Sequence, residues 1–144
     1  MIGTRRYATG TAVPVDRTRA EIERLLERHG AGGFAYGTTN GQTMLAFEMR
    51  DRRLRFLVPM PTPNKSRTDE HRVKAEIRRR YRALLLVLKA KLEAVASQIV
   101  TFDEEFLAHI VTHGGVTIGD QVVPGLAEVL KGGKLPPLLG AGAP

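Results

Sequence analysis

The chain has 144 residues and a formal net charge of +7, from 22 basic and 15 acidic side chains. Cysteine is absent, which excludes a thiol nucleophile, a disulfide scaffold and a cysteine-ligated metal. No run of about 18 apolar residues is present, so no segment is expected to span a membrane. The N-terminus lacks the apolar core of a secretory signal, and we expect a cytoplasmic protein. The length suits a single domain, which we place at residues 14–131.

The first part of the chain predicts an arm followed by a helix. Residues 1–13 contain two glycines and several threonines, as a flexible arm or an edge strand would. Asp16 or Thr18 can cap a helix that runs to about His29, because Thr18 and Glu21 have the spacing of a capping box. Gly30 then provides a natural stop for this helix.

The next part predicts a three-stranded antiparallel meander over residues 34–39, 42–49 and 53–58. Asn40-Gly41 separates the first two runs, and this pair is the preferred sequence of a tight hairpin turn. The third run alternates, so one side is apolar and the other carries Arg53 and Arg55.

A Pro-rich, basic loop over residues 59–69 precedes a long helix from about Glu70 to Gln98. Its apolar residues recur every three or four positions and form one stripe: Val73, Ile77, Tyr81, Leu84, Leu88, Leu92, Val95 and Ile99. Such a helix spans roughly 43 Å, twice the length of the strands, so its basic first half should project beyond the sheet. Leu86 lies on the polar face and requires a neighbour.

Two short helices should complete an α+β fold. Thr101 can cap a helix to about Val111, with Phe102, Phe106, Leu107 and Ile110 facing inward. Asp120 can cap a last helix through Lys131, with Pro124 in its first turn. Two prolines and a Gly-Ala repeat predict a disordered tail over residues 132–144.

The net charge is concentrated in one segment. Between Lys65 and Lys91 the bases exceed the acids by seven, and the rest of the chain is neutral. Arginine outnumbers lysine 16 to 6, which suits bidentate contact with phosphate, although a GC-rich genome would give the same bias. The candidate nucleic-acid-binding residues are Arg50, Arg52, Arg53, Arg55, Lys65, Arg67, Arg72, Lys74, Arg78, Arg79, Arg82 and Lys89. They would form one strip if the third strand and the long helix are neighbours. Tyr36 and Tyr81 could stack on bases there, unless Tyr81 belongs to the apolar stripe.

Catalytic patterns are scarce. The sequence has no phosphate-binding glycine loop, no dinucleotide motif and no nucleophile elbow. Glu105, His109 and His113 have helical spacing that could hold zinc, but the glutamate general base of a metalloprotease is missing. We therefore assign no catalytic residue, no cofactor and no metal ligand. The acidic residues at 103–105 should stabilise a helix start or meet a neighbouring subunit. The candidate subunit contacts are Leu86, Asp103, Glu104 and Glu105.

Two parts of the chain resemble small, mostly uncharacterised proteins of phages and prophages in GC-rich bacteria. They are Val13–Arg17 (VPVDR) with Arg19–Glu23 (RAEIE), and Arg82–Val95 (RALLLVLKAKLEAV) running on to Thr101–Phe106 (TFDEEF). The order of the predicted elements is also similar to that of phage single-strand annealing proteins. This second resemblance implies rings or filaments that hold DNA in a basic groove, in a bacterium or a phage-infected host.

Three hypotheses follow. The leading one is a non-catalytic, homo-oligomeric nucleic-acid-binding protein that favours single-stranded DNA, acts in phage or prophage recombination and does not contact a membrane. The second is a structural or adaptor component of a phage complex, whose basic strip binds an acidic protein. The third is a small enzyme that uses Glu105, His109 and His113.

Overall fold

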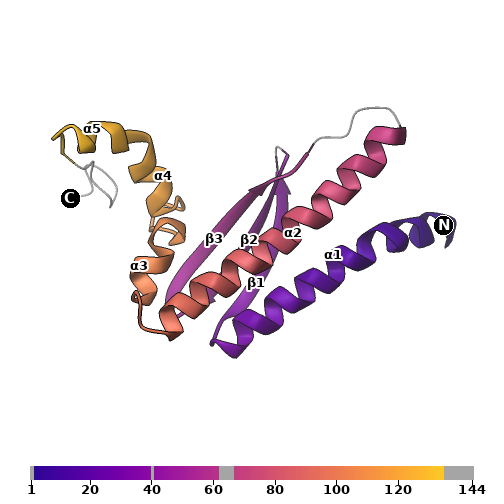
Figure 1. The fold of residues 1–144 in the computed structure, drawn as a ribbon, viewed down its shortest axis with the longest axis horizontal. Coiled ribbons are helices and arrows are strands. Elements are labelled where there is room, and N and C mark those ends of the chain that lie inside the picture. Colours follow the sequence, from indigo (N-terminus) through magenta and orange to yellow (C-terminus); the bar gives the residue numbers. More distant parts are fainter. Residues whose placement is uncertain (1, 40, 62–66, 135–144) are drawn as a thin grey trace.

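The computed structural model describes residues 2–39, 41–61 and 67–134, and the side chains of residues 15–38, 41–61 and 69–134. It is an α+β fold, as predicted: an N-terminal helix, a three-stranded sheet, a long helix and short C-terminal helices (Figure 1). The helices are α1 (Ile2–Arg28), α2 (Arg67–Ala96), α3 (Phe102–Phe106), α4 (Ile118–Val122) and α5 (Leu126–Leu130). The strands are β1 (Gly32–Thr39), β2 (Gln42–Met49) and β3 (Arg52–Pro59). The predicted tail from residue 135 and the loop at 62–66 lie outside the described residues.

The sheet is an antiparallel meander in the order β1-β2-β3, and its register pairs Tyr36 with Leu45 and Leu45 with Phe56. The turn from β2 to β3 places Arg50 at φ 52° and Asp51 at φ 61°. Two positive φ angles in a two-residue loop are typical of a type I′ turn, which usually contains Asn-Gly. Two ordinary side chains therefore adopt a conformation that favours glycine.

The core lies between one face of the sheet and the helices α1 and α2. Both helices cover this face and run side by side in the same direction (Figure 1). The side chains with essentially no exposed surface come from every layer: Ile22, Leu26, Leu45, Phe47, Leu54, Leu88 and Phe106. The predicted stripe of α2 supplies much of this core, but Ile99 lies beyond the end of the helix and is 76% exposed.

The helix α1 begins much earlier than predicted. It starts at Ile2, so residues 2–13 are helical, although the sequence suggested an arm or an edge strand. Asp16 and Thr18 lie inside the helix and not at its start. Glycine and an internal proline have poor helix propensity, but propensity is a weak guide that neighbouring structure overrides.

Within the described residues, no helix has the length and apolarity needed to cross a bilayer.

The helices α1 and α2 end in the same motif. After α1, the Gly30 amide donates to the Glu27 carbonyl and the Ala31 amide to the Leu26 carbonyl. Gly30 has φ 92°, which completes a Schellman motif and confirms the predicted stop. After α2, Gln98 occupies the equivalent position at φ 62°.

The C-terminal part agrees with the sequence at α3 and differs after it. The Thr101 hydroxyl accepts from the Glu104 amide at 3.1 Å and the Glu104 carboxylate from the Thr101 amide at 2.8 Å, so the predicted cap is confirmed. Leu107 is half exposed, contrary to prediction, because α3 ends at Phe106 and continues only as a 3-10 turn. The cap of α4 is Thr117, and Asp120 completes its capping box from inside the helix. The predicted last helix is interrupted by a 3-10 turn, Val123–Gly125, that contains Pro124.

Candidate nucleic-acid interface

The structure divides the predicted basic strip between two faces of the sheet. The helix α2 packs on the face that carries Leu54 and Phe56. Because side chains alternate along a strand, Arg53 and Arg55 point to the opposite face. The arginines of β3 and those of α2 therefore do not form one continuous surface.

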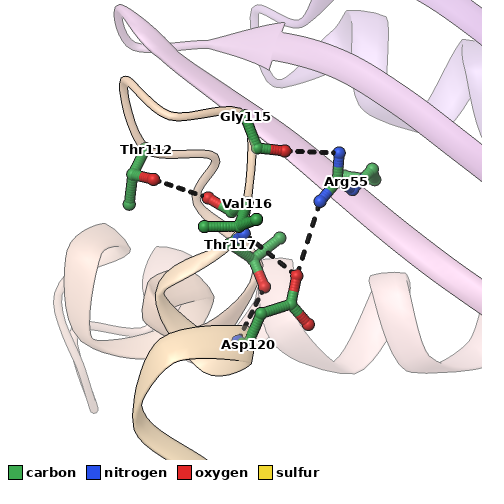
Figure 2. Close-up of polar contacts among 6 residues, drawn as sticks. All are labelled: Arg55, Thr112, Gly115, Val116, Thr117 and Asp120. Carbon is green, nitrogen blue, oxygen red and sulfur yellow. Dashed lines mark hydrogen bonds and ion pairs between the residues drawn. The ribbon is translucent and has the colours of Figure 1, made fainter. Parts of the chain in front are cut away.

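Arg55 is occupied within the chain (Figure 2). One of its nitrogens donates to the Gly115 carbonyl at 3.0 Å and another approaches the Asp120 carboxylate at 3.5 Å. The same carboxylate accepts from the Thr117 amide at 3.1 Å, and this bond holds the pKa of Asp120 below its usual value. Arg55 thus ties the loop before α4 to β3.

The turn between β2 and β3 holds α3 in place. Arg52 donates two parallel hydrogen bonds to the Asp103 carboxylate, at 3.0 and 2.9 Å, which lower the pKa of that group. The Arg50 guanidinium lies 5.2 Å from the centre of the Phe102 ring. The Arg53 side chain, in contrast, is exposed and forms no ion pair or hydrogen bond with a described residue, although its carbonyl accepts from the Val111 amide at 2.8 Å.

Several bases of α2 also have acidic partners. Arg79 and Arg80 both bind the Glu76 carboxylate, at 2.6 and 2.8 Å, and they lower its pKa to about 2. Arg72 pairs with Asp69, and the Lys74 amine lies 3.8 Å from Glu70. Lys65 and the side chain of Arg67 lie outside the described residues.

Three bases of α2 have no such partner within the described part of the chain: Arg78, Arg82 and Lys89. At 100° per residue they fall within about 40° of one another on the helix, in a row roughly 16 Å long. Arg82 and Lys89 are exposed and Arg78 is half-buried. They form the part of the predicted site that remains available to a ligand.

The helix α1 contributes a second row that the sequence reasoning missed. Its exposed bases Arg17, Arg24 and Arg28 also fall within about 40° on the helix. The acids Asp16, Glu23 and Glu27 fall on a different side of the helix, toward β1. There the Glu23 carboxylate helps to raise the pKa of Tyr36.

On the helical wheel the basic row of α1 lies on the same side as Leu25, which faces α2. A hollow of about 480 Å³ between the two helices is lined by Leu25 and His29 of α1 and by Leu86, Lys89 and Glu93 of α2, among others. Lys89 is the one member of the two rows that lines this hollow, and the helical wheels place the other five cations along its two flanks. We call the hollow with its flanks the α1–α2 groove. Its cations are Arg17, Arg24, Arg28, Arg78, Arg82 and Lys89. Two acids share this surface: Glu93 lines the hollow, and Glu21 falls within about 20° of Arg28 on the wheel of α1.

The α1 row escaped notice because acids balance bases in that segment, so a count of local charge finds nothing. A helical wheel separates the bases from Asp16, Glu23 and Glu27, although it leaves Glu21 beside the basic row. The α2 row was included among the predicted residues, but the count could not tell it from the bases that acids neutralise.

The aromatic residues do not provide a stacking surface. Tyr81 is buried, and its hydroxyl accepts from Arg19 at 2.8 Å, so it belongs to the apolar stripe. The Arg19 guanidinium also lies 4.6 Å from the centre of the Tyr36 ring, and burial raises the pKa of that tyrosine. None of the phenylalanine and tyrosine side chains that the structure describes is exposed.

Asp103, Glu104, Glu105 and His109 all have partners within the chain. Glu104 caps α3, and Glu105 binds Lys91 at 3.1 Å. The His109 ring stacks on Phe56 at a centroid distance of 3.9 Å, and burial lowers its pKa. His113 is exposed. The described residues contain no group of three or more metal-binding side chains.

Leu86 is 63% exposed on the wall of the α1–α2 groove, where the sequence predicted an apolar residue in need of a neighbour. The described residues leave it mostly uncovered.

A comparison with protein families, curated proteins and solved structures finds no match for this chain.

Proposed function

We propose that this chain is a non-catalytic nucleic-acid-binding protein that holds the phosphate backbone in the α1–α2 groove. The observation that supports the proposal is the pair of cation rows that border the groove, whose members have no partner among the described residues. Arginine supplies five of the six cations, and its fork of donors matches phosphate oxygens.

Binding through this groove should depend little on base sequence. The described aromatic side chains are not exposed, so stacking cannot select bases there. We favour single-stranded DNA, with phage or prophage recombination as the setting, because the order of the elements is similar to that of single-strand annealing proteins. Fold analogy is a weaker argument than the charge distribution.

The test is the salt dependence of binding to a short, labelled oligothymidylate, measured by fluorescence anisotropy. Six contacts with single-stranded phosphate predict a slope of log K against log salt of about −4, or roughly a 300-fold loss between 50 and 200 mM salt. Arg24→Ala and Arg82→Ala should each reduce the slope by about 0.7.

Arg79→Ala is the matched control, because Arg79 lies on the same helix as Arg82 but is paired with Glu76. Its slope should equal that of the unmodified chain. A flat salt dependence, or an Arg79→Ala loss as large as that of Arg82→Ala, would contradict the proposal.

The exposed Leu86 favours a second candidate function, an adaptor that binds an acidic protein. A protein partner would bury this leucine, whereas a phosphate backbone would not. Polyglutamate serves as the acidic probe. If it binds as tightly as the oligonucleotide and Leu86→Ser abolishes this binding, the result supports the adaptor function. If the α1–α2 groove binds nucleic acid, Leu86→Ser and the unmodified chain should bind the oligonucleotide with equal affinity.

A further inference from the structure

The segment from α4 to α5, residues 118–130, has apolar side chains but no core of its own. None of its residues is buried. Val123, Leu126 and Leu130 are 61%, 42% and 77% exposed. Their spacing of three and four places them on one side of the segment. We call this segment the C-terminal arm, and its apolar side requires a partner.

Among the described residues, the contacts that attach the arm to the rest of the chain lie near its beginning. Arg55 holds the loop before it and Asp120 (Figure 2), and Gly119 lies so close to Ala108 that an added Cβ would be 2.7 Å from the Ala108 carbonyl oxygen. From there α4 and α5 lead away from the sheet (Figure 1). Beyond Val122, α5 packs mainly on the 3-10 turn that precedes it.

The sheet has an uncovered face that suits such a helix. The face opposite α1 and α2 carries small and apolar residues that the register places side by side: Ala35 beside Ala46, Gly37 beside Met44, and Met44 beside Leu57. Leu57 is 44% exposed. A hollow of about 360 Å³ lies on this face beside the loop that Arg55 holds. Glu48, Arg53 and Arg55 share this face and the loop that Arg55 holds lies against one end of it, but the remainder is apolar and open. An open apolar surface of this kind is half of a two-layer packing unit.

The arm and the open face match in length. The arm has 13 residues, about 20 Å if it is helical throughout. Each strand has eight residues, about 26 Å. The arm can therefore lie along the strands without projecting beyond them.

The charges of the two surfaces also match. Glu48 and Arg53 are exposed and directly opposite each other at one end of the open face. Glu128 and Lys131 are exposed and one turn apart near the end of the arm. None of the four side chains forms an ion pair or a hydrogen bond with a described residue. Both pairs are separated by about 5 Å, so Glu128 can meet Arg53 while Lys131 meets Glu48.

We propose that the C-terminal arm of one copy covers the open sheet face of a second copy of this chain. The arm leaves its own sheet at the point where Arg55 holds it, so a second copy supplies the face that it needs. Reciprocal exchange of arms closes a dimer, and exchange in one direction builds a ring or filament. This inference does not rest on nucleic-acid binding, because neither surface includes the α1–α2 groove.

The first test is sedimentation velocity without nucleic acid, over a range of protein concentrations. The unmodified chain should associate, and Leu126→Asp with Leu130→Asp should sediment as a monomer. Ile99→Asp is the matched control: Ile99 is as exposed as Leu130 but belongs to neither surface. A monomeric unmodified chain, or equal dissociation by the control, would overturn the proposal.

The second test uses the absence of native cysteine, since any disulfide must then join introduced residues. Ala46→Cys and Leu126→Cys are prepared as separate variants, mixed and oxidised, and circular dichroism verifies that each is folded. The proposal expects a disulfide between the two variants. Crosslinking of Ala46→Cys only with itself would indicate sheet-to-sheet packing and overturn it. A double variant that closes its disulfide within a monomer would also overturn it, because the arm would cover its own sheet.

Discussion

Gln98 offers a direct measurement of backbone strain in this fold. It occupies the left-handed position that ends α2, at φ 62°, where the Gln98 amide donates to the Val95 carbonyl and the Ile99 amide to the Ala94 carbonyl. In helices that end this way the position is usually taken by glycine, because glycine has no Cβ to clash. Gln98→Gly should therefore stabilise the chain.

The magnitude follows from two opposing contributions. The left-handed conformation costs an ordinary residue about 1–2 kcal/mol, and glycine avoids this cost. Glycine also loses more backbone entropy on folding, which offsets the stabilisation by roughly 0.5–1 kcal/mol. The Gln98 side chain is exposed and makes no hydrogen bond with a described residue, so its removal adds little. The net expectation is a gain of about 0.5–1 kcal/mol, or a rise in Tm of roughly 2–4 °C.

Urea denaturation and thermal scans of Gln98→Gly provide the assay, and Gly30→Ala is the mirror control. Gly30 ends α1 in the same motif at φ 92°, with nothing within 4 Å of an added Cβ, so its loss of stability reports backbone strain alone. That variant should lose about 1 kcal/mol. If Gly30→Ala is destabilised while Gln98→Gly shows no gain, the strain assigned to Gln98 is wrong.

Three further predictions concern polar contacts. Arg79 and Arg80 lower the pKa of Glu76 from 4.5 to about 2, so these pairs stabilise the folded chain above pH 4.5 and lose that effect as the pH falls through about 2. Glu76→Gln should flatten this loss in urea midpoints measured at a series of acid pH values, and an unchanged profile would contradict it. Thr117→Ala removes the cap of α4 at a cost of about 1 kcal/mol, so the Asp120 amide should exchange hydrogen about fivefold faster while the global Tm stays constant. Tyr81→Phe leaves Arg19 without its buried acceptor and should cost about 1–2 kcal/mol in urea denaturation; a neutral effect would show that the Arg19 bond is not stabilising.

Local signals in the sequence predicted the elements well. The stripe of α2 and the Thr101 cap depend on residues within a few positions of one another, so no knowledge of the tertiary structure was needed. The start of α1 was missed because its first residues have weak intrinsic preferences. The cap of α4 was misplaced because Thr117 and Asp120 both have the chemistry of a cap, and the sequence does not say which one begins the helix.

The candidate site was harder to predict, because ion pairs join residues far apart in the chain. Asp103 lies 51 positions from Arg52 and Asp120 lies 65 positions from Arg55. A count of charges treats all of these arginines as free. The alternation of β3 was visible in the sequence. It implies that α2 covers the apolar side of the strand, so that Arg53 and Arg55 lie on the opposite face of the sheet from the α2 cations.

The pairing of α1 with α2 has a consequence for how the protein is made. The three strands form by local hairpins, each joined to the next by a two-residue turn, so the sheet can assemble as it leaves the ribosome. Ile22 and Leu26 have no exposed surface in the folded chain, yet part of the core around them comes from Leu88, more than sixty residues later. The first helix must therefore wait for the second before its apolar side is fully covered. During synthesis that side is open to chaperones, and a chain released before α2 is complete should aggregate.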